Sequence, residues 1–306
     1  FADGRHYLLG GGLIIVTIVT VPDPVNIKRH ESQNRGSPRL TATAKKFAAA
    51  VFGLYAWTSF TVHAVITSLL LAVTPGLRNR RRIARAFSRS FLASAGLRLT
   101  VNQPAPMPGE ACVVVANHAS YLDGIILTAA LPPNFAFVIK QEIRKVPIGH
   151  FLLRRLGSQF VDRVNRRPGA REVRRLIGAA HRGSARAILP EGTFATEPGL
   201  LPVRRTAFAA AARASMPLVP VVIRGSRKAL AAGSIWVRPA RIGVMVTPPL
   251  DFSASREPPD AHALLQLARD RILAHLDEPD RGRLRGPESE PGPGAVSGRR
   301  PPRGPG

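Results

Sequence analysis

Blocks of apolar residues alternate with polar segments along most of the chain, and they predict the elements of an α/β fold. Short apolar runs rich in β-branched residues are typical of buried strands, and apolar residues at helical spacing are typical of helices. The expected strands are Arg98–Val101, Cys112–Ala116, Phe135–Ile139, Gln159–Asp162, Ala185–Leu189, Leu218–Ile223 and Ile242–Val246. The expected helices are Gly124–Ala130, Ile148–Leu156, Gly169–His181, Arg205–Ala214 and Ala261–Leu276. This alternation predicts a central, mostly parallel sheet flanked by helices.

A long apolar segment precedes the alternating part of the chain. Phe47–Val73 contains no Asp, Glu, Lys or Arg, and it is longer than the roughly twenty residues that cross the hydrocarbon core of a bilayer. A buried core helix is the alternative, but such a helix rarely extends this far without a polar face. Arg80–Ala95 then has an apolar stripe and several Arg residues suited to anionic headgroups. We therefore expect membrane-associated helices, spanning or re-entrant, within residues 45–95.

These patterns divide the chain into four parts. Residues 1–44 form a poorly defined N-terminal segment and linker, in which the apolar run Tyr7–Val21 is short for a bilayer span. Residues 45–95 are the membrane-associated helices, and residues 96–276 are the globular domain. Residues 277–306, mostly Pro, Gly, Arg and Glu, are expected to be disordered. The larger basic cluster follows the apolar segment, which favours a cell-membrane location with the globular domain on the cytoplasmic face.

The turn between the second expected strand and the first expected helix of the domain carries the candidate chemistry. His118 and Asp123 are five residues apart, so on one uninterrupted helix they would point about 140° apart. If His118 instead precedes the first helical turn, the Asp123 carboxylate can hold one imidazole nitrogen and leave the other as a base near neutral pH. General-base catalysis on a hydroxyl requires this arrangement.

Simpler interpretations of this turn remain open. A His and an Asp near a turn are often only a satisfied surface pair, so catalysis needs the support of further motifs. Ser120 is a candidate nucleophile by residue type, but an N-cap for the following helix is the favoured role.

The chain is strongly basic, with 44 Lys and Arg against 19 Asp and Glu and a formal net charge of +25. This charge favours an anionic partner such as a membrane surface, a phosphorylated substrate, a CoA-like donor or nucleic acid. Nucleic acid is disfavoured, because aromatic residues make up only 6% of the chain and do not interleave with the Arg clusters. The single cysteine, Cys112, excludes an intramolecular disulfide and fits a reducing compartment.

Three further segments accompany the turn Asn117–Asp123. They are Lys140–Arg163 with Pro147, Gly149 and Gly157 inside it, Leu189–Thr193 at the end of an expected strand, and Met216–Val221. In this order and at these spacings, the four segments resemble the sequence blocks of the 1-acylglycerol-3-phosphate acyltransferase family. The resemblance covers residues 97–249, about half of the chain.

The resemblance implies roles for individual residues. The His of the first block takes the proton from the acceptor's hydroxyl and the Asp orients it, and these are His118 and Asp123 here. The hydroxyl then attacks the thioester of acyl-CoA or acyl carrier protein directly, so no metal or bound prosthetic group is expected. Substrate binding, chiefly of the acceptor's phosphate, is assigned to Asn117, Lys140, Arg163, Glu191, Gly192, Thr193 and Arg204.

One position departs from the family pattern. The third block usually continues with Arg, and position 194 is Phe here. A replacement for the missing guanidinium could come from Arg204, which is favoured, or from Arg205, Arg224 or Arg227. Otherwise the acceptor depends less on a phosphate monoester.

The charge of Glu191 suggests a supporting role beside the acceptor. A carboxylate does not attract a phosphate oxygen, so Glu191 is expected to anchor an Arg or cap the turn, while the N–H groups of Gly192 and Thr193 face the anion.

We therefore expect a membrane-bound O-acyltransferase that acylates a lysophospholipid, first of all 1-acylglycerol-3-phosphate, to give phosphatidic acid. The alternatives are another lysolipid acceptor, hydrolysis of the thioester by the same pair, and a non-catalytic protein that binds anionic lipid. Only the net charge supports a nucleic-acid binder.

Overall fold

The strands form one sheet in the order β1-β7-β6-β2-β5-β3-β4. The computed structural model describes residues 39–108, 111–161, 174, 177–178, 185–250, 252 and 260–281. The strands in these ranges are β1 (Leu97–Asn102), β2 (Val113–Ala116), β3 (Ala136–Lys140), β4 (Gln159–Val161), β5 (Arg186–Ile188), β6 (Leu218–Arg224) and β7 (Ala240–Val246). Every neighbouring pair is parallel except β6 and β7. The predicted mostly parallel sheet is confirmed, and each strand lies within two residues of its expected position.

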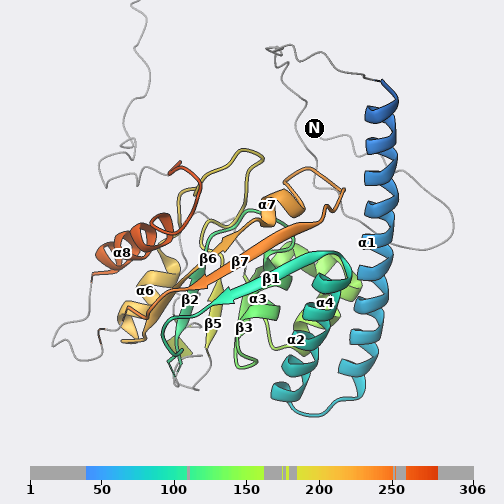
Figure 1. Ribbon diagram of the computed structural model, residues 1–306. Coiled ribbons are helices and arrows are strands. Elements are labelled where there is room, and N and C mark those ends of the chain that lie inside the picture. The colour runs from blue at the N-terminus through green and yellow to red at the C-terminus, as the bar shows by residue number, and fades with distance from the viewer. Residues whose placement is uncertain are drawn as a thin grey trace, which may run out of the picture.

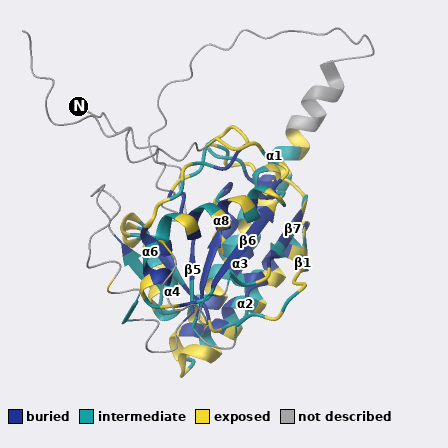
Figure 2. Cartoon of the chain, turned by 90° about the vertical axis from the view of Figure 1, so that its left-hand side faces the viewer, coloured by how far each residue is buried: buried dark blue, intermediate teal, exposed yellow. Residues whose placement is uncertain are grey.

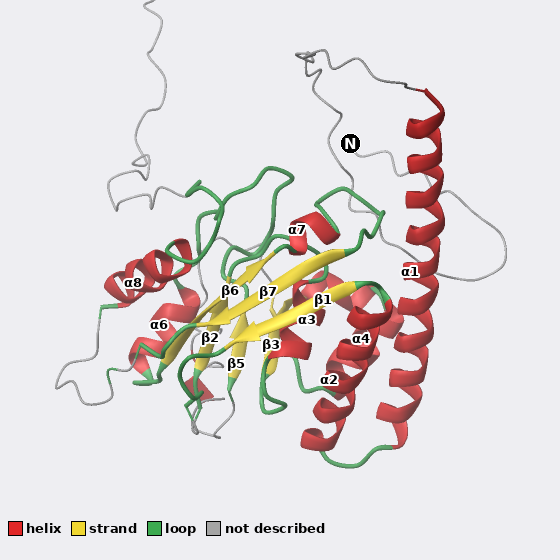
Figure 3. Ribbon diagram, in the orientation of Figure 1, coloured by secondary structure: helices red, strands yellow, loops and turns green. Residues whose placement is uncertain are grey.

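Helices cover both faces of the sheet (Figure 1; Figure 3). The helices of the domain are α3 (Asp123–Ala130), α4 (Pro147–Arg155), α6 (Thr206–Arg213), α7 (Ser226–Ala229) and α8 (Ala261–Leu273), with a 3₁₀ turn at Gln141–Lys145. Most of the expected helix Gly169–His181 lies outside the described residues. The others are confirmed because their apolar residues follow the helical period that predicted them.

The core divides into two layers because side chains alternate across β2. Val114 and Ala116 belong to the layer that includes residues of α2 (Leu77–Ser94) and α3. Val113 and Val115 belong to the layer that includes residues of α6 and α8. All four side chains are completely buried, and Figure 2 shows in dark blue that buried residues gather in the strands and in the helix faces turned toward them. A strand that is buried on both faces and has parallel neighbours on both sides places its carboxyl end at the centre of one edge of the sheet.

Helix α1 (Arg39–Val73) packs beside α2 and α4 and extends past the domain (Figure 1). Its segment Phe47–Val73 is long and apolar enough to cross a membrane, and only 17% of its most apolar window is buried. The predicted apolar helix is therefore present, and one side of it carries exposed apolar side chains while the other packs against the protein.

Several Arg residues of α2 have partners within the protein, so the expectation that they serve headgroups is corrected for these residues, whereas Arg78 and Arg82 are exposed. Arg81 is buried and donates to the carbonyls of Asn134 and Leu156, at 2.7 and 3.0 Å. Arg85 and Arg89 both donate to the carbonyl of Ala129, near the end of α3. Cations are favoured there because the last carbonyls of a helix lack intrahelical partners.

The segment Asp277–Arg281, which we call the C-terminal strap, corrects the expected start of the disordered tail. Backbone hydrogen bonds link Leu200 to Pro279 and Arg281, at 2.9 and 3.0 Å. Arg269 of α8, which is nearly fully buried, pairs with Asp280. Charged residues in a Pro-rich sequence indicated a solvated segment, but these charges have partners on the folded domain.

Candidate active site

The turn after β2 is held in place by Asn117. Its amide nitrogen donates to the carbonyl of Ile223 at 2.9 Å, and its amide oxygen accepts the N–H of the same residue at 2.7 Å. Asn117 is buried, and these bonds connect the turn to β6, the neighbouring strand. Asn117 was expected to bind substrate, but both polar groups of its side chain bond to the backbone of Ile223, which makes it a clamp within the protein.

His118 and Asp123 meet as the sequence predicted. Their Nδ1 and Oδ2 atoms are 2.8 Å apart, because α3 begins only at Asp123 and His118 lies in the non-helical turn. The same Oδ2 accepts the N–H groups of Ala119 and Ser120, at 2.7 and 2.8 Å. Asp123 is completely buried at the positive end of the α3 dipole, whereas the His118 side chain is 15% exposed. With Nδ1–H donating to the carboxylate, Nε2 is the acceptor nitrogen of the neutral ring.

Ser120 has a structural role in the same turn. Its hydroxyl donates to the carbonyl of Leu230 at 2.7 Å and accepts the N–H of Leu122 at 3.1 Å. The side chain is completely buried. The hydroxyl thus holds the entry to α3, as expected of a capping residue, although it does so two residues before the N-cap position at Leu122.

Glu191 connects this turn to the loop that follows β5. One carboxylate oxygen accepts the N–H of His118 at 2.6 Å, and the other accepts the N–H of Leu201 at 2.9 Å. Glu191 is 6% exposed, and burial raises the pKa of its carboxyl to about 7, with a smaller contribution from the Asp123 charge. Its two backbone hydrogen bonds lower the pKa and partly oppose this rise. Of its two expected roles, the structure places Glu191 as the cap of the turn.

Phe194 lies directly against the imidazole of His118. The ring centroids are 4.4 Å apart at an interplanar angle of 60°, and the ring of Tyr121 lies 4.7 Å from Phe194 in an edge-on arrangement. Tyr121 is exposed. Phe194, which replaces the usual Arg of the third block, is therefore part of the site. Its aromatic ring lies beside His118, where a cation was expected.

The turn before Phe194 uses the backbone differently from the expected anion cradle. Gly192 adopts a φ of +75°, which favours glycine, and its N–H donates to the carbonyl of Leu189 at 3.2 Å. This bond closes the turn, so the Gly192 N–H does not simply face a ligand. Thr193 is exposed beside it.

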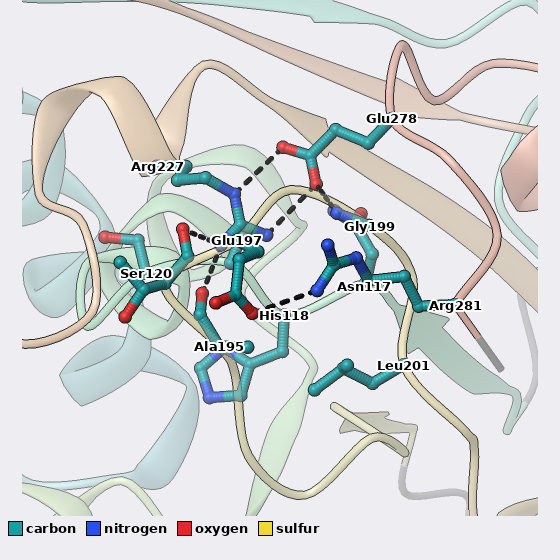
Figure 4. A network of polar contacts seen from close by, with 12 residues as sticks. Asn117, His118, Ser120, Ala195, Glu197, Gly199, Leu201, Arg227, Glu278 and Arg281 are labelled. Carbon is teal, nitrogen blue, oxygen red and sulfur yellow. Dashed lines mark hydrogen bonds and ion pairs between the residues drawn. The ribbon is translucent and has the colours of Figure 1, made fainter. Parts of the chain in front are cut away.

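Arg227 holds the loop that carries Phe194 against the C-terminal strap (Figure 4). Its Nε and Nη2 atoms donate to the two carboxylate oxygens of Glu278, at 3.1 and 3.0 Å, and its Nη1 donates to the carbonyl of Ala195. Glu278 also accepts the N–H of Gly199 at 2.8 Å. Arg227, one of the candidate replacements for the missing guanidinium, is therefore engaged within the protein.

The remaining candidates lie at or near the same edge of the sheet. Lys140 ends β3 and is half-buried, and parallel pairing through β5 places this strand end on the edge that carries His118. Arg204 is exposed, and its N–H donates to the carbonyl of Pro190 at 3.0 Å. Arg224 makes a loose ion pair with Asp277 at 3.6 Å. Arg163 lies outside the described residues, just after β4.

Nothing in the sequence indicated two features of the site. Tyr121 gave no signal beyond being an aromatic residue in the turn, and the Arg227–Glu278 pair joins residues 51 apart in the chain.

Within the ranges that the structure describes, His, Cys, Asp and Glu form no group of three that could hold a metal ion.

Comparisons with known proteins show that the chain is similar to acyltransferases. Residues 98–224 match the sequence model of the family described as Acyltransferase. The chain is 30% identical over 147 residues to 1-acyl-sn-glycerol-3-phosphate acyltransferase of Neisseria gonorrhoeae, covering 48% of this chain and 57% of that protein. It is 36% identical over 185 residues to 1-acyl-sn-glycerol-3-phosphate acyltransferase beta of Homo sapiens, covering 58% and 65%. The chain thus spans between half and two thirds of the length of these relatives.

A solved structure shares the fold. It is the 1-acyl-sn-glycerophosphate (LPA) acyltransferase PlsC from Thermotoga maritima, with a TM-score of 0.62 and 20% sequence identity. The match covers 75% of this chain and 97% of that one.

Proposed function

We propose that this chain, of which residues 98–224 match the acyltransferase family model, is a membrane-bound member of that family that acylates a lysophospholipid. The acyl donor is acyl-CoA or acyl carrier protein, and the first candidate acceptor is 1-acylglycerol-3-phosphate, which would give phosphatidic acid. The observation that carries the proposal is the hydrogen bond between His118 Nδ1 and the buried Asp123 carboxylate, at a partly exposed imidazole on the carboxyl edge of a parallel sheet.

This pair can perform direct acyl transfer. The acceptor's hydroxyl gives its proton to Nε2 of His118 as its oxygen bonds to the thioester carbon, and the Asp123 carboxylate stabilises the resulting imidazolium. The C–S bond then breaks, and the departing thiolate takes the proton from the imidazolium. Oxygen gains the acyl group, sulfur gains the proton, and no acyl-enzyme forms.

Residues around this pair are proposed to bind the acceptor. Lys140, Arg163 and Arg204 would supply positive charge for a phosphate, and Thr193 would supply hydrogen bonds. Glu191, Gly192 and Asn117 would act indirectly by holding the turn and the loop, as their hydrogen bonds to the backbone indicate.

The contact between Phe194 and His118 favours a second candidate acceptor. An aromatic ring 4.4 Å from the imidazole gives no charge to a phosphate monoester. A lysophospholipid with a substituted headgroup, or another hydroxylated lipid, would lose less from this replacement. The two candidates share the reaction and differ only in the headgroup.

Helix α1 supports the membrane assignment. Its uncovered apolar segment Phe47–Val73 is about 40 Å long at 1.5 Å per residue, which exceeds the roughly 30 Å hydrocarbon core. We propose that α1 attaches the enzyme to the cell membrane, with the domain on the cytoplasmic face, as the basic residues that follow α1 favour.

An acceptor panel tests this function. Membranes that carry the protein are incubated with labelled oleoyl-CoA and either 1-acylglycerol-3-phosphate or lysolipids with choline, ethanolamine or glycerol headgroups. His118→Ala should lower transfer at least about 10²-fold, while His262→Ala, on α8, should leave it unchanged.

The outcomes separate the alternatives. Transfer by His118→Ala within tenfold of wild type would refute the mechanism. Release of free fatty acid without added lysolipid would identify a thioesterase, and vesicle binding without transfer to any acceptor would identify a lipid-binding protein.

A further inference from the structure

The loop between α7 and β7 exposes two adjacent large apolar residues. Ile235 and Trp236 are 53% and 43% exposed. Isolated apolar residues on a surface are ordinary. This pair is different because the loop lies beside α1, which has its own uncovered apolar surface (Figure 1).

Two contacts fasten the loop to α1. The indole N–H of Trp57 donates to the carbonyl of Ile235 at 2.6 Å. The ring of Trp236 occupies the space beside Gly53, where a Cβ would lie 2.5 Å from Cε3 of the indole. Gly53 and Trp57 are one helical turn apart and therefore share a face of α1. The loop and the helix thus form one continuous surface.

Between Phe47 and Val73, the large exposed side chains of α1 are apolar. Those near the loop are Phe47 at 71%, Val51 at 53%, Leu54 at 69% and Tyr55 at 51% exposed. After the exposed Thr58, further exposed apolar residues follow on the same helix, namely Val62, Val65, Ile66, Leu69, Leu70 and Val73. Exposed apolar residues of α1 lie on both sides of the point where the loop contacts the helix. Ile235 and Trp236 therefore enlarge the apolar surface of α1 at that point.

The chemistry of the loop fits the headgroup layer of an anionic bilayer. Tryptophan is enriched at that depth, where its ring is apolar and its N–H remains near water. The segment from Gly225 to Leu250 contains no Asp or Glu, and it carries the exposed cations Lys228 and Arg238 on either side of the apolar pair. Cations next to an interfacial apolar contact are attracted by anionic lipid.

The loop is also joined to the turn that carries His118. The carbonyl of Leu230, at the start of the loop, accepts a hydrogen bond from the Ser120 hydroxyl at 2.7 Å. Ser120 lies two residues after His118 in the same turn. A loop seated on the bilayer would therefore hold this turn close to the membrane surface.

We propose that Ile235 and Trp236 form a second membrane contact, which docks on an anionic phospholipid bilayer together with the exposed face of α1. The ring of Trp236 lies in the headgroup layer. This contact goes beyond acyl transfer, and it is measured without any acyl donor or acceptor.

The chain has only two tryptophans, so fluorescence reports the contact directly. The full-length Trp57→Phe protein, with Trp236 as its one tryptophan, is reconstituted into vesicles of phosphatidylcholine and phosphatidylglycerol, with and without bromine on the upper acyl carbons. We expect brominated lipid to quench at least half of the emission. For a matched control, Leu267→Trp is placed in the Trp57→Phe, Trp236→Phe background, because Leu267 is an equally exposed apolar residue of α8, at 56%. Its emission should be unchanged.

Equal emission of Trp236 in brominated and unbrominated vesicles would overturn the proposal, and so would equal quenching of the Leu267→Trp control. If Trp57→Phe does not fold, the difference in quenching between the wild type and Trp236→Phe isolates the same ring. A positive result with no acyl transfer would leave the contact standing and reject the proposed reaction.

Discussion

The buried carboxyl of Glu191 makes stability depend on pH in a way that the structure specifies. Burial raises the pKa of this group from the usual 4.5 to about 7. Between these values the folded protein binds a proton that the unfolded chain has released, so rising pH favours unfolding. At about 1.4 kcal/mol for each pKa unit, the span from 4.5 to about 7 corresponds to about 3 kcal/mol. This stability is fully present below pH 4.5 and is lost by about pH 7.

Glu191→Gln isolates this contribution. Glutamine does not ionise, but it presents an NH₂ group to the N–H of either His118 or Leu201, and the lost hydrogen bond costs about 1–3 kcal/mol. Near neutral pH, the free energy lost with the hydrogen bond nearly cancels the free energy gained because no charge is buried. The stability of Glu191→Gln at one pH therefore does not separate the two effects. The difference between the two proteins across pH is informative, because other titrating groups contribute equally to both.

The assay is urea unfolding of the full chain in detergent micelles, followed by fluorescence between pH 5 and pH 8. We expect the wild type to lose about 2.5 kcal/mol relative to Glu191→Gln over this range. Glu197→Gln is the control, because the Glu197 carboxylate is 65% exposed in its pair with Arg281, and its stability should parallel that of the wild type. The reasoning would be refuted if the difference in free energy of unfolding between wild type and Glu191→Gln did not change with pH. It would also be refuted if the wild type became more stable relative to Glu191→Gln as the pH rises.

Three further substitutions test the site. Asn117→Ala leaves both polar backbone groups of Ile223 without their side-chain partner, so the free energy of unfolding should fall by about 2–5 kcal/mol in urea titrations. Asp123→Asn removes the charge beside His118 and should lower acyl transfer at least about 10²-fold in vesicle assays, with the protein still folded by circular dichroism. Phe194→Arg should raise the ratio of transfer to 1-acylglycerol-3-phosphate over transfer to lysophosphatidylcholine, and an unchanged ratio would exclude position 194 from acceptor selection.

Local sequence patterns were sufficient for the secondary structure and for the reacting pair. The strands follow from short apolar runs rich in β-branched residues and the helices from an apolar period of about 3.6 residues, which each segment carries by itself. His118 and Asp123 are five residues apart across one turn, so their meeting depends only on where α3 begins. The apolar helix α1 is equally evident from composition, because no charged residue interrupts Phe47–Val73.

The surroundings of that pair were decided by tertiary structure. Glu191 binds the N–H of a residue 73 positions earlier, and Arg227 binds Glu278 51 positions later. Such contacts depend on which strands become neighbours in the sheet, and no local period encodes that order. The sequence therefore determined the pair that is proposed to carry the chemistry, whereas only the folded chain decided that Arg227 is engaged within the protein and that the ring of Phe194 lies against the imidazole.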